Sequence, residues 1–237
     1  VYSTSPSTTY TMTVNSSFSV GSDAVFEINK SNSGSQPTVI KIFGDVGIDG
    51  VVTETGNNTG SVLELAGTND GYFYGVETGM ENDVSITLNK TGGAIMYSFA
   101  DIFMSAGANA KLNLTSGVFD MATYAATMII QNTSTGAVVG GTVGSHIMGP
   151  MRRFTNQTAA YVFPVSNSVD QLAKASITPA GTDETEWTVE FIEPNPDDSN
   201  GLSTGVIDQV SDYYWNINRE GAFPADRSEE HTSELQS

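Results

Sequence analysis

His146 is the histidine best placed to act as a base in this chain, because His231 falls in a C-terminal segment unlike the rest of the sequence. A Ser–His–Asp triad needs such a base beside an activated serine. No serine stands in a nucleophile-elbow pattern, and His146 falls at the edge of a strand expected over residues 144–148. We therefore expect a structural or surface role for His146 and assign no catalytic residue.

Two carboxylates, Asp45 and Asp49, lie four residues apart in a segment of alternating hydrophobicity, so they are expected to share a strand face. Paired carboxylates cleave glycosidic bonds in many enzymes. A β-helical polysaccharide lyase also needs a base, and residues 38–149 contain only three lysines and no arginine. We expect a solvated acidic face here, and a glycan-active enzyme remains the alternative.

Residues 195–201, Asn-Pro-Asp-Asp-Ser-Asn-Gly, gather oxygen atoms that calcium prefers as ligands. Their spacing and the lack of a distal glutamate do not fit an EF-hand, so we expect a mobile acidic loop. The chain has no cysteine, which excludes disulfides, thiolate nucleophiles and cysteine-based metal sites. No metal or cofactor site is predicted.

An aromatic run, Tyr72-Phe73-Tyr74, is flanked by glycines. Such rings could form a platform for stacking sugars, but aromatic residues more often fill the interior of a coil or pack at its end, and we favour that interpretation. The adjacent pair Arg152-Arg153 is unusual in so acidic a protein. We expect an inter-domain role in which one arginine pairs with an acid of the neighbouring sandwich, while the other could be simply solvated.

Charge and composition exclude several classes of protein. The formal net charge is −18, so the chain would be repelled by nucleic acid and by anionic membrane surfaces. No apolar run approaches the roughly 18–20 residues needed to span a bilayer. The chain begins at Val1 without a visible signal peptide and looks like the middle of a longer protein.

Short apolar runs recur at regular intervals and predict a stacked β-architecture. Each is an alternating or continuous group of Val, Ile, Leu and Ala, and most end at Gly, Asn or Asp. They fall at residues 39–43, 62–65, 84–88, 112–115 and 137–139. We predict a right-handed parallel β-helix-like solenoid over residues 38–149, and no helix in residues 99–110 or 121–127.

The rest of the chain is expected to be β-structure too. Residues 1–37 contain two predicted strands, at 10–14 and 24–28, that continue the coil, so the solenoid would occupy residues 1–149. After Pro150, prolines and both tryptophans predict a β-sandwich-like module over residues 150–226. Residues 227–237 resemble a translated sequencing adapter, and we treat them as a non-native tail.

Four motifs occur in a fixed order: L-N-L-T-S-G at 112–117, G-P-M-R-R at 149–153, Y-V-F-P-V at 161–165 and Y-W-N-I at 214–217. In order and spacing they resemble the large secreted and cell-surface proteins of Bacteroidetes-type bacteria, over roughly residues 60–220. Ser166 stands where those proteins commonly have glycine, and residues 171–173 also depart from their pattern. The resemblance implies export by the type IX route through a C-terminal sorting domain, and adhesive or matrix roles.

From these observations we predict an all-β, non-enzymatic display or adhesion segment located outside the cell or on the bacterial outer surface. Extracellular glycans or surface proteins are the expected partners, with no nucleic acid and no membrane insertion. The alternatives are a glycan-active, polysaccharide lyase-like β-helix enzyme and a purely structural spacer. The oligomeric state is left open.

Overall fold

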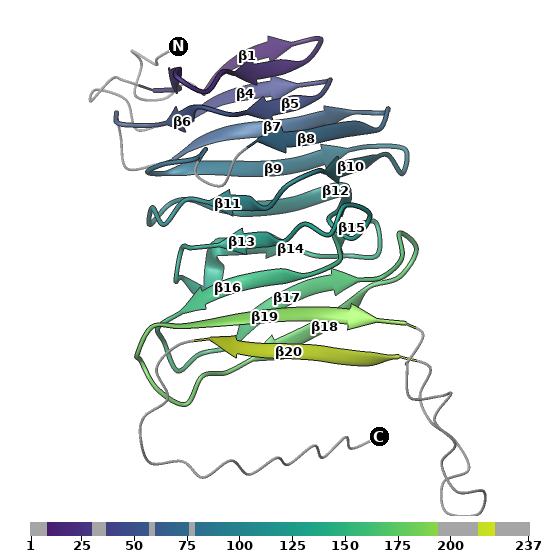
Figure 1. The fold of residues 1–237 in the computed structure, drawn as a ribbon. Helices are drawn as coiled ribbons and strands as arrows, with labels where there is room; N and C mark the ends of the chain where they lie inside the picture. Colours follow the sequence, from purple (N-terminus) through teal and green to yellow (C-terminus); the bar gives the residue numbers. More distant parts are fainter. Residues whose placement is uncertain (1–8, 30–36, 57–59, 76–78, 194–212, 221–237) are drawn as a thin grey trace, which may run out of the picture.

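The structure is a computed structural model that describes residues 9–29, 37–56, 60–75, 79–193 and 213–220. Within these ranges the chain forms twenty β-strands and one short 3₁₀ helix, η1 (Thr135–Ala137). Most of these strands stack in parallel into a β-solenoid, which confirms the predicted all-β solenoid (Figure 1). Three faces surround one interior, and successive turns of the coil lie above one another.

The first face is a parallel sheet that contains all five predicted apolar runs. Ile40 lies opposite Leu63, and Leu63 lies opposite Ile86, so equivalent side chains form columns inside the coil. The prediction that the apolar runs stack on one another is therefore confirmed. The strands of this face are β1 (Tyr10–Val14), β4 (Thr38–Ile42), β7 (Ser61–Gly67), β9 (Val84–Lys90), β12 (Leu112–Asp120) and β14 (Val138–Gly140).

The second face shares strand β12 with the first, because β12 turns the corner without ending. Gly117 stands at that corner with φ +89°, and a Cβ there would come within 2.6 Å of the Cβ of Lys90, so only glycine fits. The strands of this face are β2 (Phe18–Val20), β5 (Val46–Ile48), β8 (Gly71–Gly75), β10 (Ile95–Ser98), the end of β12, β15 (Ser145–Met148), β17 (Tyr161–Ser166) and β18 (Ala173–Ile177).

The third face completes the triangular cross-section of the coil. In the third turn of the coil it is reduced to a single bridge between Val52 and Met80. Its strands are β3 (Val25–Glu27), β6 (Val51–Thr53), β11 (Ile102–Met104), β13 (Met128–Ile130), β16 (Met151–Thr155), β19 (Thr185–Ile192) and β20 (Tyr214–Glu220).

The interior is one continuous hydrophobic core that runs from Phe18 to Phe191. Ile40, Leu63 and Ile86 are all 0% exposed. A fully buried side chain of this size contributes about 1.5–3 kcal/mol relative to an exposed one. The stability of the coil therefore comes mainly from these inward columns together with the backbone ladder.

Parallel pairing continues past Pro150, where the sequence changes character. Strand β16 pairs in parallel with β13, and β17 pairs in parallel with β15. The direction then reverses, because β18 and β19 add in antiparallel fashion to β17 and β16, and β20 adds in antiparallel fashion to β19. Two antiparallel layers thus extend the second and third faces over the same core.

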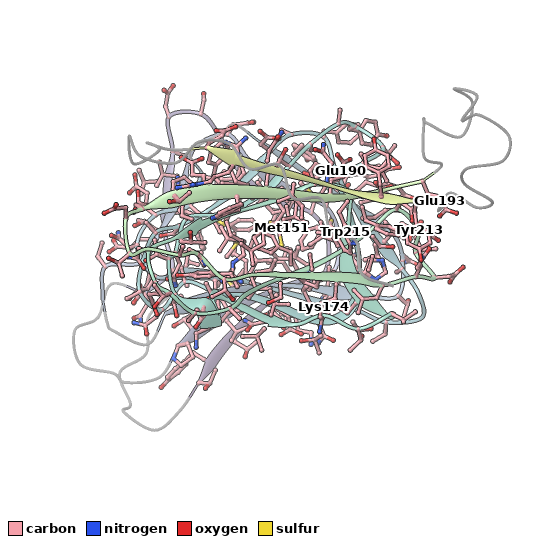
Figure 2. The ribbon with its side chains drawn as sticks, turned by 90° about the horizontal axis from the view of Figure 1, so that it is seen from below. Met151, Lys174, Glu190, Glu193, Tyr213 and Trp215 are labelled. Atoms are coloured by element: carbon pink, nitrogen blue, oxygen red, sulfur yellow. The ribbon has the colours of Figure 1, made fainter. Side chains whose placement is uncertain are left out.

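Seen from the C-terminal end, Met151 and Trp215 lie between the β19–β20 pair and β18 (Figure 2). The ring of Trp215 contacts the ring of Phe191 edge-on at 5.0 Å. Lys174, Glu190 and Glu193 lie around this end of the molecule (Figure 2). The side chains of Met151, Phe191 and Trp215 fill the end of the coil where the strand direction has changed.

Candidate functional site

Four aromatic side chains contact one another along the outside of the second face and the turns that follow it, and we call Tyr72, Tyr97, Phe99 and Tyr124 the aromatic row. Strand β8 reads Gly-Tyr-Phe-Tyr-Gly, so the pleat turns Phe73 inward and its two neighbours outward. Tyr72 is 41% exposed and Phe73 is 5% exposed. The interpretation that this run fills the interior is correct for Phe73 and wrong for Tyr72 and Tyr74.

The register of the parallel strands holds the row together. Tyr97 of β10 lies opposite Tyr72 of β8, and their rings are stacked with centroids 5.6 Å apart. The ring of Phe99 is stacked with Tyr72 at 5.4 Å and contacts Tyr124 at 4.0 Å. Phe99 is 47% exposed and Tyr124 is 41% exposed. The row is thus a contiguous aromatic surface rather than scattered single rings.

Tyr74 extends the aromatic surface over the neighbouring turn of the coil. Its side chain lies across Gly47 of β5, where a Cβ would come within 2.4 Å of the ring atom Cε2. Tyr74 is 38% exposed, so the ring covers the glycine on one side and meets solvent on the other. Glycine at position 47 thus leaves space for the ring.

Carboxylates border the aromatic row. The pKa of Tyr97 is raised from its usual value of 10.0, first by burial and then by the negative charges of Asp70 and Asp120. Asp45 accepts a hydrogen bond from the backbone N–H of Tyr72 at 3.0 Å. The row therefore lies in a field that disfavours additional negative charge.

Lys90 is the cation nearest these carboxylates, and it is buried. Its Nζ donates a hydrogen bond to the backbone carbonyl of Asn69 at 2.8 Å. Burial lowers its pKa from 10.5, and the charges of Asp45 and Asp70 partly oppose that shift. The ammonium group is thus turned into the corner beneath β8.

Asp45 and Asp49 do not share a strand face, because β5 spans only Val46–Ile48 and the two acids lie at its opposite ends. Asp45 instead belongs to a set of corner carboxylates, each of which accepts a backbone N–H from the next turn of the coil. The donors are Tyr72 N to Asp45, Ile95 N to Asp70, Asn109 N to Asp83 and Thr127 N to Asp101. These carboxylates hold successive turns in register.

His146 has a structural position. The ring is 0% exposed, and β15 is paired on both sides, with β12 and with β17. Its Nε2 lies 2.9 Å from the carbonyl oxygen of Ser168, and its Nδ1 lies 3.3 Å from that of Thr142. The ring thus links two loops to the second face.

Arg152 and Arg153 differ sharply. Arg152 pairs with Glu186 of β19 at 3.5 Å and with Glu220 of β20 at 4.0 Å, so the expected ion pair with an acid of the C-terminal part is present. All three residues lie within 150–226, so this ion pair does not join the two predicted domains. Arg153 points the opposite way and is 0% exposed, so the expectation that the second arginine could be simply solvated is wrong.

The guanidinium of Arg153 is held by carbonyl groups and aromatic rings. It donates hydrogen bonds to the carbonyl oxygens of Val162 at 2.9 Å, Ser134 at 2.8 Å and Thr135 at 3.3 Å. It also lies over the ring of Tyr161 at 5.0 Å. Burial lowers its pKa from the usual range of an arginine to about 10. This arginine joins η1, β16 and β17 where the strand direction reverses.

The remaining candidate sites give weaker support for a function than the aromatic row does. A cleft of about 320 Å³ lies beside Trp187 and Arg219, whose guanidinium is 5.6 Å from the indole centroid. The acidic loop 195–201 and the tail 227–237 lie outside the described residues. Across the part of the chain that the structure describes, no group of three or more His, Asp or Glu side chains is placed to hold a metal ion, and no helix could span a membrane.

Tyr97, Phe99 and Tyr124 were not among the predicted site residues, although their spacing in the sequence is a signal for them. Tyr97 follows Tyr72 by 25 residues and Tyr124 follows Phe99 by 25 residues, close to the spacing of the apolar runs. Comparisons with protein families, with curated proteins and with solved structures found no match for this chain. The geometry of the described residues therefore carries the functional argument alone.

Proposed function

We propose that this chain is a non-enzymatic display or adhesion segment of an extracellular or bacterial outer-surface protein, and that the aromatic row is its contact surface for glycans. One observation supports the glycan contact above all. Several rings that touch one another are left exposed along one side of the coil, on strand β8 and in the turns that follow β10 and β12. Contiguous exposed apolar surface on a folded protein marks an interaction site more often than single exposed residues do.

Glycans fit this surface because a pyranose ring has an apolar C–H face that packs on aromatic rings, while its hydroxyls bond to polar groups beside them. Each such contact is weak. A long glycan that meets several rings, or several copies of the protein, gains strength by multivalency. Surface proteins that carry such glycans are equally acceptable partners, and nucleic acid is disfavoured by the net charge of −18.

A structural spacer is the second candidate, because the rings also contact one another between turns of the coil. Stacked aromatic pairs stabilise a protein by about 0.5–1.5 kcal/mol beyond the area they bury. In a spacer, the row would stabilise the coil and bind nothing. The two proposals differ in what removal of a ring does to binding.

Binding to a glycan array by the wild type and by Phe99→Ala tests the proposal. Tyr213→Ala is a matched control, because Tyr213 is 49% exposed and lies at the C-terminal end, away from the row. We expect the wild type and Tyr213→Ala to retain the same glycans and Phe99→Ala to lose them. A wild type that retains no glycan supports the spacer, and release of unsaturated uronate from an acidic polysaccharide would support the lyase-like enzyme.

A further inference from the structure

Resting on the proposed glycan contact, we infer that the aromatic row takes amino-bearing glycans of the glucosamine type and rejects glycans that carry carboxylates. Such a chain offers apolar C–H faces to the rings and ammonium groups to the carboxylates beside them. The inference rests on where the charged groups around the row lie and on which of them can reach a ligand.

Asp70 is the carboxylate best placed to meet a ligand. It is exposed and directly precedes β8, the strand that carries Tyr72. The backbone N–H of Ile95 donates to its Oδ1 at 2.8 Å. A carboxylate has about four acceptor positions, so this single bond leaves capacity for an ammonium donor. Asp45 is half-buried and is likewise engaged through Oδ1 by one backbone N–H.

Asp120 adds charge without reaching solvent. It is 2% exposed, and its two oxygens accept hydrogen bonds from the backbone N–H of Thr123 at 2.9 Å and from the hydroxyl of Thr123 at 2.5 Å. Its negative charge nevertheless acts on Tyr97, which lies opposite it in the neighbouring strand. Asp120 therefore strengthens the field over the row but makes no contact with a ligand.

Two lysines of the first face, Lys90 and Lys41, are already engaged. Lys90 is buried and its Nζ donates to Asn69, so it offsets part of the negative charge but cannot reach a carboxylate on a ligand. Lys41, on the first face, is paired with Glu64 at 2.9 Å. A glycan with carboxylates would therefore meet the carboxylates of Asp45 and Asp70 with its own. A glycan with ammonium groups would meet opposite charge beside aromatic faces that also attract cations.

Isothermal titration calorimetry with three hexasaccharides tests the inference. The three sugar hexamers are built of β-linked glucosamine, of β-linked N-acetylglucosamine and of a uronate. Acetylation removes the positive charge but keeps the pyranose faces. We expect the glucosamine hexamer to bind roughly tenfold more tightly than the acetylated one, a difference of about 1.4 kcal/mol. We expect the uronate hexamer not to bind. The preference should shrink as salt is raised, because the carboxylates are near solvent.

Substitutions that keep the fold sharpen the test. In Asp70→Asn the side-chain oxygen still accepts the N–H of Ile95, so the corner is preserved while the charge is removed. We expect about threefold weaker glucosamine binding for Asp70→Asn and roughly tenfold for Asp45→Asn/Asp70→Asn, with binding of the acetylated hexamer unchanged. Asp49→Asn is the control, since it removes one exposed charge at the opposite end of β5.

The outcomes separate this inference from the proposed function. Equal binding of the two glucosamine-based hexamers, or binding of the uronate, overturns the inference and leaves a glycan-binding surface in place. Equal weakening by Asp49→Asn and Asp70→Asn also overturns it, because the overall charge would then explain the preference. If the wild type binds no hexamer and retains no glycan on the array, the proposed function fails together with the inference.

Discussion

The first and second faces of the coil enclose the same interior, but they differ in the side chains that they present to solvent: the first face is mainly polar and the second is aromatic. On the first face, Lys41, Glu64, Thr87 and Asn113 lie opposite one another in successive strands, and we call them the polar ladder. Lys41 pairs with Glu64 at 2.9 Å, and Asn113 donates to Thr87 at 3.1 Å. On the second face, Tyr72 of β8 and Tyr97 of β10 occupy outward positions, and Phe99 and Tyr124 continue the aromatic row in the turns after β10 and β12.

The polar ladder demonstrates that a turn of this coil does not need aromatic residues on its outside. Polar side chains pair from turn to turn and remain hydrated, whereas the aromatic row leaves apolar surface in water. The first face also exposes an apolar side chain, because Val139 lies opposite Asn113 and is 46% exposed, but it has no contiguous group of exposed rings among the described residues. Contiguous apolar surface of this kind is more typical of an interaction site than single exposed residues are. The comparison therefore favours a binding role for the aromatic row.

The largest effect should come from the interior that both faces share. Leu63 is 0% exposed and stacks between Ile40 and Ile86. We expect Leu63→Ala to lower the free energy of unfolding by about 3 kcal/mol, because it creates a cavity under both faces. Urea denaturation followed by circular dichroism measures it. A loss below about 1 kcal/mol would mean that the column is not packed as described.

The next largest loss of stability is expected at Arg153, which joins η1, β16 and β17 where the strand direction reverses. Arg153→Met would leave the carbonyl groups of Val162, Ser134 and Thr135 buried without their donors, and we expect a loss of about 2–3 kcal/mol. Arg152→Met is the neighbouring control and should cost less than about 1 kcal/mol, because its ion pairs are partly exposed. Equal losses from the two substitutions would contradict the structural difference between them.

A smaller effect distinguishes the two outer surfaces directly. Tyr72→Ala removes two stacked contacts, and we expect it to lower the free energy of unfolding by about 1–2 kcal/mol. Glu64→Gln breaks the ion pair with Lys41 on the first face and should cost about 0.5 kcal/mol. Glycan binding should be lost in the first variant and kept in the second. Loss of binding in both would remove the distinction between the faces.

The smallest effect is a pH dependence at the aromatic row. The pKa of Tyr97 is raised above 10.0, so just above pH 10 the folded protein keeps a proton that the unfolded chain has lost, and stability falls as pH rises. Arg153 acts in the opposite sense, because burial lowers its folded pKa to about 10, below the value in the unfolded chain. The difference between wild type and Tyr97→Phe isolates the tyrosine.

Absorbance at alkaline pH measures the ionisation of the tyrosines, and denaturation at the same pH values measures stability. Tyr97→Phe should remove the phenol that resists ionisation and should make the decline in stability above pH 10 less steep. Asp70→Asn should lower the pKa of Tyr97 towards 10.0, because it removes one of the charges that raise it. An unchanged titration in Asp70→Asn would show that the carboxylate does not act on the row.

The sequence predicted the stacked coil because its apolar runs recur with the period of one turn, and that period is a property of the chain itself. Strand β2 (Phe18–Val20) was missed, since three residues are too few for a clear alternation. The segment of alternating hydrophobicity that contains Asp45 and Asp49 is divided by a corner into β5 and β6. The prediction that the two acids share a strand face was wrong for this reason.

The site was less predictable than the fold. Arg153 is buried because it donates hydrogen bonds to the carbonyl groups of Ser134, Thr135 and Val162, which come together only after folding. No local sequence pattern predicts that arrangement. The aromatic row could have been found, because Tyr72 and Tyr97 recur with the same period as the core. Attention to the three adjacent aromatics in Tyr72-Phe73-Tyr74 obscured that longer spacing.

The corner carboxylates have a consequence for how such a molecule can lengthen or shorten over generations. Asp45 binds the N–H of Tyr72, 27 residues later, and Asp70 binds that of Ile95, 25 residues later. A duplicated turn would bring its own acceptor for the turn below and its own N–H for the turn above. Gain or loss of whole turns therefore preserves these bonds, whereas a deletion of a few residues within a turn breaks them.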